Sequence, residues 1–154
     1  MSSNRNKPAV PLKLATSPIH GMGVFAASPI ARSTAIVEYT GRRMSHREAD
    51  RRHASLSPAD ATYLFVVDST TVIDATIGGN LARFVNHSCA PNCVSVLRDG
   101  RVWLEALRDI APGEELSYHY RLRIPGGLRS PEAERYVCTC TAPDCTGSLI
   151  TRRR

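Results

Sequence analysis

Lysine is scarce in this chain of 154 residues, which holds only Lys7 and Lys13 against eighteen arginines. Arginine-favouring codon usage is the simplest explanation of this bias. The formal net charge of +6 is also compatible with nucleic-acid binding. The arginines are scattered, however, and only the final TRRR forms a cluster. Direct binding of nucleic acid is therefore the less favoured interpretation.

A long hydrophobic run is also missing from the sequence. No stretch approaches the ~20 apolar residues of a membrane-spanning helix. The first ten residues, MSSNRNKPAV, hold no apolar core of a signal peptide. We therefore expect an intracellular protein with no membrane span. In that setting the five cysteines are expected to be thiols or metal ligands rather than disulfides.

The chain is rich instead in short alternating or β-branched segments separated by Pro and Gly, which are typical of strands. Strands are predicted at residues 10–15, 23–27, 35–41, 63–67, 71–74 and 116–120. Residues 93–107, CVSVLRDGRVWLEAL, predict a hairpin, because Asp-Gly is the strongest short signal for a tight two-residue turn.

One helix is expected, over residues 44–56, where Ser45 and Glu48 have the spacing of a capping box. The βαβ alternation of a dinucleotide-binding fold is absent. The chain is therefore predicted to be a single, mostly β domain built from several small sheets. Residues 121–136 are rich in Arg, Pro and Gly, which is typical of a linker or a mobile loop.

A group of three cysteines near the C-terminus, in CTCTAPDC, predicts a metal site. Cys138, Cys140 and Cys145 are closely spaced, and structural zinc takes four tetrahedral ligands, so one ligand must come from elsewhere. Cys89 and Cys93 are the other cysteines, and His20, His87 and His119 are weaker candidates. The alternative is three reduced thiols on an exposed tail.

A second unusual stretch is RFVNHSCAPNC, residues 83–93, with one His, two Asn and two Cys. From the residues alone it could be a metal site, a nucleophile with its base, or a tight buried turn. Taken with IHGMGVFA, EYTG, GEELSYHY and CTCTAPDC, it resembles the SET-domain protein-lysine methyltransferases with a post-SET zinc segment. The resemblance covers residues 12–149.

That resemblance implies a β-clip fold of small sheets, with a pseudoknot in which the RFVNHSC segment threads under a loop. It divides the chain into an N-terminal tail (1–9), a SET domain (10–122), a post-SET segment (123–149) and a basic tail (150–154). It also makes S-adenosylmethionine the expected cofactor. The residues implied to contact it are His20, Gly21, Met22, Gly23, Tyr39, Arg83, Phe84, Asn86 and His87.

The same resemblance implies the residues of catalysis and of the metal site. Tyr120 corresponds to the catalytic tyrosine, Tyr118 to the aromatic that sets the number of methyl groups, and Tyr63 to an aromatic near the target lysine. Cys89 corresponds to the fourth zinc ligand beside Cys138, Cys140 and Cys145. Cys93 is then expected to be a buried thiol.

The expected activity is transfer of one or two methyl groups to lysine in a histone or another basic protein, with nucleic acid involved only indirectly. Scarcity of lysine also suits an enzyme that avoids modifying itself. His119 departs from the family, which usually has an acidic residue there, and the segment before Tyr63 is short. Such a bare unit fits a bacterial cytoplasmic protein, or a nuclear one if chromatin is the target. The alternatives are a non-catalytic SET-like peptide-binding module and a basic nucleic-acid-associated protein.

Overall fold

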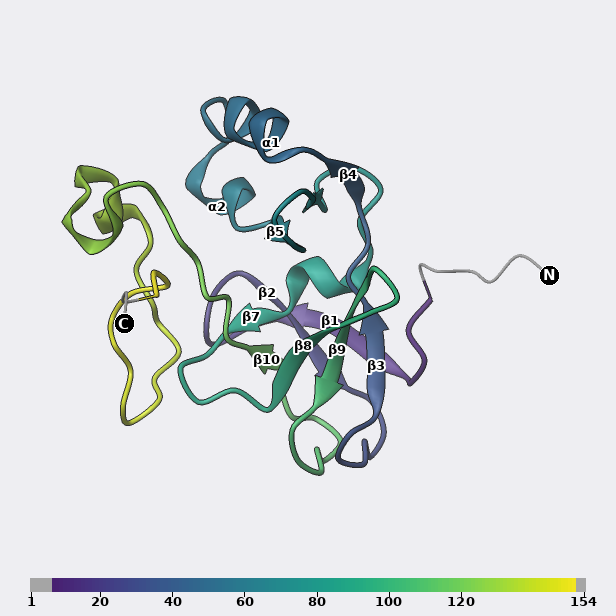
Figure 1. Cartoon of the computed structure of the whole chain (residues 1–154). Helices are drawn as coiled ribbons and strands as arrows, with labels where there is room; N and C mark the ends of the chain where they lie inside the picture. Colours follow the sequence, from purple (N-terminus) through teal and green to yellow (C-terminus); the bar gives the residue numbers. More distant parts are fainter. Residues whose placement is uncertain (1–6, 152–154) are drawn as a thin grey trace.

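The computed structural model describes residues 7–151, whose strands form several small β-sheets (Figure 1). The strands are β1 (Leu12–Thr16), β2 (Met22–Ala26), β3 (Ala35–Glu38), β4 (Arg42–Met44), β5 (Leu64–Val66), β6 (Val72–Asp74), β7 (Asn86–His87), β8 (Cys93–Arg98), β9 (Arg101–Ala106) and β10 (Ser117–Tyr118). The helices are α1 (His46–His53) and α2 (Pro58–Ala61), and the 3-10 turns are η1 (Leu81–Phe84), η2 (Gly127–Arg129) and η3 (Pro131–Arg135). The prediction of a mostly β fold with several small sheets is confirmed.

The largest sheet has the order β3-β9-β8, and all its pairs are antiparallel. β8 and β9 form the predicted hairpin. Its turn residues Asp99 and Gly100 have φ values of 50° and 74°, the pair of positive angles that a type I′ turn requires. Buried residues of this sheet, such as Ile36 and Leu104, belong to the main hydrophobic core.

A second three-stranded sheet, in the order β4-β6-β5, packs against helix α1 (Figure 1) through Met44, Ala49 and Val72. Helix α1 begins after Ser45, whose Oγ accepts the N–H of Glu48 at 3.2 Å. The reciprocal half of the predicted capping box is absent, since the Glu48 carboxylate accepts from Arg42 instead, at 2.7 Å. The prediction of a single helix is wrong because α2 is present as well. At four residues it is too short to show a hydrophobic period.

The parallel pair β7–β10 joins two distant segments at the centre of the molecule. The Ser88 N–H donates to the Tyr118 carbonyl at 3.2 Å. Asn92 reaches the same segment with both ends of its amide, donating to the Glu115 carbonyl at 2.8 Å and accepting from the Ser117 N–H at 2.9 Å. These bonds hold the RFVNHSC segment against residues 115–118, as the expected pseudoknot requires.

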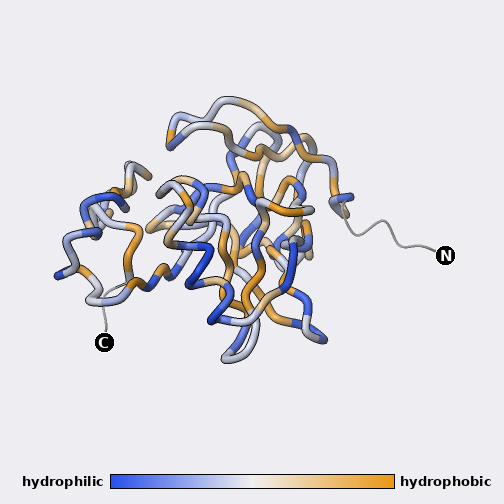
Figure 2. Tube along the Cα trace, turned by 90° about the horizontal axis from the view of Figure 1, so that it is seen from above, coloured by the Kyte–Doolittle hydropathy of each residue, from blue (hydrophilic) through white to orange (hydrophobic). Residues whose placement is uncertain are grey.

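The C-terminal segment stands at one side of the sheets and carries fewer apolar residues than they do (Figures 1 and 2). Residues 121–136, expected to be a linker or mobile loop, contain η2 and η3. A parallel bridge pairs Leu122 with Ile150, and an antiparallel bridge pairs Val137 with Ser148. Residues 1–6 and 152–154, which include most of the expected terminal tails, lie outside the described part. No helix within residues 7–151 is long and apolar enough to cross a membrane.

Candidate active site

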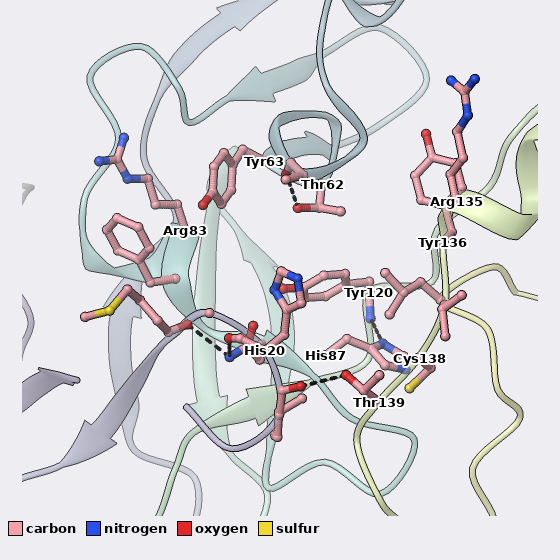
Figure 3. Close-up of a pocket in the computed structure, with 18 residues that line it drawn as sticks. His20, Thr62, Tyr63, Arg83, His87, Tyr120, Arg135, Tyr136, Cys138 and Thr139 are labelled. Atoms are coloured by element: carbon pink, nitrogen blue, oxygen red, sulfur yellow. Dashed lines mark hydrogen bonds between the residues drawn. The ribbon is translucent and has the colours of Figure 1, made fainter. Parts of the chain in front are cut away.

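A cavity of about 400 Å³ lies between the sheets and the C-terminal segment (Figure 3). It is lined by seven of the nine residues predicted to contact the cofactor, namely His20, Gly21, Met22, Arg83, Phe84, Asn86 and His87. Gly21 lies in the left-handed region with φ of 46°, which lets the loop before β2 turn back at the rim. We refer to this space as the first cavity.

The two remaining predicted residues, Gly23 and Tyr39, do not line the first cavity. A side chain at Gly23 would collide with the carboxylate of Glu115, so this glycine allows the loop and Glu115 to pack closely. Tyr39 is 2% exposed, and its hydroxyl donates to the backbone carbonyl of Tyr63 at 3.0 Å. Both therefore support the cavity from behind its wall.

Asn86 fastens the loop of residues 20–22 to the centre of the fold. Its Nδ2 atom lies 3.0 Å from the His20 carbonyl, 3.1 Å from the Met22 carbonyl and 3.0 Å from Glu115 Oε1. Glu115 Oε1 also accepts the Ser17 hydroxyl at 2.6 Å. The amide oxygen of Asn86 makes no hydrogen bond among residues 7–151, which leaves an acceptor at the cavity wall for a bound molecule.

His87 is held as a neutral ring between the two halves of the site. Its Nδ1 accepts the backbone N–H of Tyr120 at 3.0 Å, and its Nε2 lies 3.5 Å from Cys89 Sγ. Burial and the nearby His119 lower the pKa of His87 to about 4. Both ring nitrogens are therefore engaged, and the ring is poorly suited to take a proton from a substrate.

The three predicted tyrosines occupy different positions around the cavity. Tyr120 donates its hydroxyl to the Val85 carbonyl at 2.8 Å, and its ring lies 4.9 Å from that of Tyr118. Burial raises the pKa of both phenols above the usual value, so both stay protonated near neutral pH. Tyr63 lines the first cavity next to Phe84, with 6.2 Å between ring centroids.

A second cavity of about 440 Å³ has Tyr120 in its lining as well. It is bounded by residues of β5, β8 and the segment 118–123. Thr62 and Tyr120 line both cavities, whereas Tyr118 lines the second alone and Tyr63 the first alone. The two cavities therefore meet at Tyr120.

Four cysteines from two distant parts of the chain converge next to the first cavity. The sulfurs of Cys89, Cys138, Cys140 and Cys145 all lie within 4.8 Å of one another. The distances from Cys89 Sγ to those of Cys138 and Cys145 are 3.8 and 4.0 Å. Thiolates at about 2.3 Å from a tetrahedral zinc would lie about 3.8 Å apart, so the cluster fits such an ion.

The fifth cysteine, Cys93, is outside this cluster, as expected. It is 1% exposed, its thiol donates to Asn92 Oδ1 at 3.4 Å, and burial raises its pKa to about 12. Cys93 is thus a protonated core thiol.

The cluster adjoins one wall of the first cavity, because Cys138 belongs to both. That wall consists of residues 135–139 and Leu149. It is tied to the loop before β2 by the Thr139 hydroxyl, which donates to the Ile19 carbonyl at 2.6 Å (Figure 3). Leu122 and Arg123, at the start of the C-terminal segment, line the second cavity.

Two contributors to the site were not anticipated from the sequence. Glu115 holds Asn86 and Ser17 together, although its motif GEEL gives no sign of that role. Tyr136 lines the first cavity, is 3% exposed, and lies with its hydroxyl 3.0 Å from His53 Nε2 on α1. A lone tyrosine in an Arg- and Pro-rich segment carries no local signal for this contact.

The fold and the site together define a SET domain, and the family of that description matches residues 21–121. The chain therefore belongs to the SET-domain family, and the cysteine cluster fits a post-SET zinc segment. It is 42% identical over 145 residues to a histone-lysine N-methyltransferase, H3 lysine-4 specific, of Yarrowia lipolytica, and 41% identical over 150 residues to the protein of that name from Saccharomyces cerevisiae. These alignments cover 90% and 94% of this chain but only 12% and 14% of the relatives.

Both predictions, of the SET domain and of its cysteine segment, are thus confirmed. The relatives are enzymes, which supports the predicted class of protein-lysine methyltransferase. They are also fungal, and a bacterial origin of this chain stays a prediction.

Proposed function

We propose that this chain transfers a methyl group from S-adenosylmethionine to the side-chain amine of a lysine in a protein substrate. The observation that carries the proposal is the meeting of two cavities at Tyr120. An in-line displacement at a methyl carbon requires donor and acceptor on opposite sides of that carbon. Two separate cavities with one shared tyrosine provide this arrangement, and positioning of this kind can supply most of a rate enhancement.

The first cavity is proposed to hold S-adenosylmethionine, whose sulfonium supplies an electrophilic methyl group. Its volume lies in the range of small-molecule sites. Arg83 Nε is buried without a hydrogen-bond partner among the described residues, and a carboxylate of the bound molecule would satisfy it. The amide oxygen of Asn86 can accept from an ammonium group. Gly23 and Tyr39 act indirectly in this proposal, by packing behind the wall.

The second cavity is proposed to admit the lysine from the opposite side. The amine must be neutral to react, although its ordinary pKa is about 10.4. The buried ring of Tyr118 and the half-buried ring of Tyr120 disfavour an ammonium, and so does a positive sulfonium nearby. Because Tyr120 already donates to the Val85 carbonyl, its hydroxyl oxygen is fixed in place and is free to accept from the amine.

The four-cysteine cluster is proposed to hold a structural zinc ion. The ion would use Cys89, Cys138, Cys140 and Cys145, with no open position for chemistry. Its role would be to hold the wall of residues 135–139 against the RFVNHSC segment. Metal binding would then supply folding energy to a segment with little core of its own. We also propose that the SET domain spans residues 10–122 and the post-SET segment 123–149.

The names of the relatives make histones the first substrates to test, along with other basic proteins, and suggest a chromosomal location. Nucleic acid would be involved only through such a substrate. The alternative of a non-catalytic peptide-binding module is disfavoured, because Asn86 and Tyr120 are both in place at the cavity.

The test is incubation with a labelled methyl donor and a panel of lysine-containing proteins, histones included. Lys7→Arg and Lys13→Arg remove both lysines of the chain, so all label in this background belongs to the substrate. Tyr120→Phe removes the hydroxyl at the meeting point of the cavities, and activity is expected to fall by roughly 100-fold or more. Label transfer at the same rate by Tyr120→Phe would contradict the proposal.

A further inference from the structure

The charged side chains that line the second cavity are all positive. Its charged or titratable side chains, apart from the tyrosines, are those of His119, Arg121 and Arg123, and no Asp or Glu lines it within the described chain. Arg121 and Arg123 are exposed, and neither takes part in an ion pair among residues 7–151. Their positive charges therefore face whatever occupies this cavity.

Asp68 and Glu115 form no ion pair with these arginines. Asp68 lies two residues after β5, a strand that lines the cavity. Its Oδ1 accepts the N–H groups of Thr70 and Thr71 at 2.8 and 2.9 Å. Glu115, close to the site in sequence, is directed to Ser17 and Asn86 on the side of the first cavity.

The position of Arg121 is fixed by its backbone. It has φ of 51°, a left-handed conformation that residues other than glycine seldom adopt. Its N–H donates to His119 Nδ1 at 3.0 Å, which holds the turn immediately after Tyr120. Unusual backbone conformations of this kind persist where the surrounding structure requires them. The fold therefore sets the direction in which the side chain of Arg121 leaves the backbone, directly after the shared tyrosine.

Most of the other residues that line the second cavity are apolar, and several of them belong to β5 and β8, two strands at sheet edges. β5 ends the order β4-β6-β5, and β8 ends the order β3-β9-β8. Val66 on β5 and Leu97 on β8 are 61% and 50% exposed, and both line the cavity. Such exposed edges can accept an extended peptide through backbone hydrogen bonds, and here they offer it apolar contacts as well.

Building on the proposed methyltransferase function, we propose that the second cavity selects a target lysine flanked by apolar and acidic residues and disfavours one flanked by basic residues. Apolar neighbours of the lysine would cover Val66 and Leu97, and an acidic neighbour would pair with Arg121 or Arg123. Like charges next to these arginines repel one another. A histone or other basic protein would then present its lysine from a locally apolar or acidic stretch.

The test uses three synthetic peptides with one central lysine and acidic, neutral or basic residues in an otherwise identical apolar sequence. Methylation by the intact chain is measured as kcat/KM with labelled donor. The acidic peptide is expected to exceed the neutral one by roughly 1.5- to 5-fold for each exposed charge pair, and the basic peptide to fall below it. The preference is expected to shrink in high salt.

The variants Arg123→Glu and Arg121→Glu/Arg123→Glu are expected to reverse the order of the acidic and basic peptides. Arg129→Glu, on η2 and outside both cavities, makes the same charge change and is expected to keep the wild-type order. Equal methylation of all three peptides by the wild type overturns this inference and leaves the methyltransferase function standing. If the Arg121→Glu/Arg123→Glu variant still prefers the acidic peptide to the basic one, the inference is also overturned. Absence of methylation of these peptides and of every protein in the panel overturns the methyltransferase function itself.

Discussion

The side-chain nitrogen of Asn86 lies 3.0 Å from the carboxylate of Glu115, across 29 residues of sequence. The same nitrogen bonds the carbonyls of His20 and Met22. One amide thus joins the loop before β2 to the segment that leads into β10. The shape of the first cavity depends on this junction.

We predict that Asn86→Ala abolishes binding of S-adenosylmethionine. The substitution removes an acceptor for the ligand and leaves the Glu115 carboxylate and two carbonyls with one partner fewer. The cost in unfolding free energy is expected to be about 1–3 kcal/mol. Titration calorimetry measures the binding, and chemical denaturation measures the stability.

Ser17→Ala is the comparison variant, because Ser17 also bonds Glu115 but does not line the first cavity. Its Oγ also accepts the N–H groups of Ile19 and His20, so this variant is expected to lose some affinity for the cofactor, but far less than Asn86→Ala. Unchanged affinity in a folded Asn86→Ala protein would rule out the proposed role of Asn86.

We predict one zinc ion per chain. Cys89→Ser is expected to lose the metal and Cys93→Ser to retain it, because only Cys89 belongs to the cluster of four sulfurs. Elemental analysis of protein prepared without chelator measures the metal. A metal-free wild-type protein, or a Cys93→Ser variant without metal, would contradict the assignment.

Alkylation of the cysteines provides an independent readout of the same cluster. At pH 8 the buried Cys93, with a pKa of about 12, is still a protonated thiol and is expected to react slowly. Intact mass should therefore show protection of the cluster with metal bound, modification of the four cluster cysteines after chelation, and modification of all five in denaturant. Rapid alkylation of Cys93 in the folded protein would show that its environment is not closed.

We predict that the wild type adds one or two methyl groups and that Tyr118→Phe adds more. Tyr118 is 3% exposed, and its ring lies between those of Phe65 and Tyr120. Its hydroxyl, with any water it holds, takes up space that a methylated amine needs in order to turn. Mass spectrometry of a methylated peptide counts the groups, and efficient trimethylation by the wild type would refute this role.

The ion pair between the buried Asp74 and the partly exposed Arg52 predicts a pH dependence of stability. Burial alone would raise the pKa of Asp74, but hydrogen bonds from Thr76 and Arg52 outweigh it and lower the pKa below the usual value. A lowered folded-state pKa stabilises the protein above the unfolded value of about 3.9. That contribution is lost as the pH falls through the folded value.

Asp74→Asn is therefore expected to lose about 1.5–3 kcal/mol at pH 7 and to show a smaller further loss below pH ~4 than the wild type. Asp50→Asn, an exposed change on α1, should alter neither quantity. Denaturant titrations at the two pH values measure both, and parallel losses in wild type and Asp74→Asn would exclude this source of the dependence.

Local features of the fold were predictable from local sequence. The hairpin turn at Asp99 and Gly100 follows from the dihedral angles that these two residues tolerate. The cap at Ser45 follows from its side chain, but the partner of Glu48 does not, since Arg42 competes for that carboxylate. Helix α2 was missed, because four residues give no periodicity.

The centre of the site depends on pairing between distant segments, which no local pattern encodes. The register of Asn86 opposite Ser117 and the convergence of Cys89 with Cys138 could be expected only from the order of motifs that resemble a known family. The contact of Tyr136 with His53 lies outside those motifs. It depends on how the C-terminal segment packs in three dimensions.

The placement of Cys89 apart from its three partner cysteines has a consequence for biosynthesis. Once residues 1–121 have left the ribosome, every strand within the described residues is available to pair, yet three sulfurs of the cluster and the wall of residues 135–139 are still to come. The sheets can therefore pair before the wall of the first cavity exists. A chain cut before residue 135 would lack that wall and three of the four sulfurs.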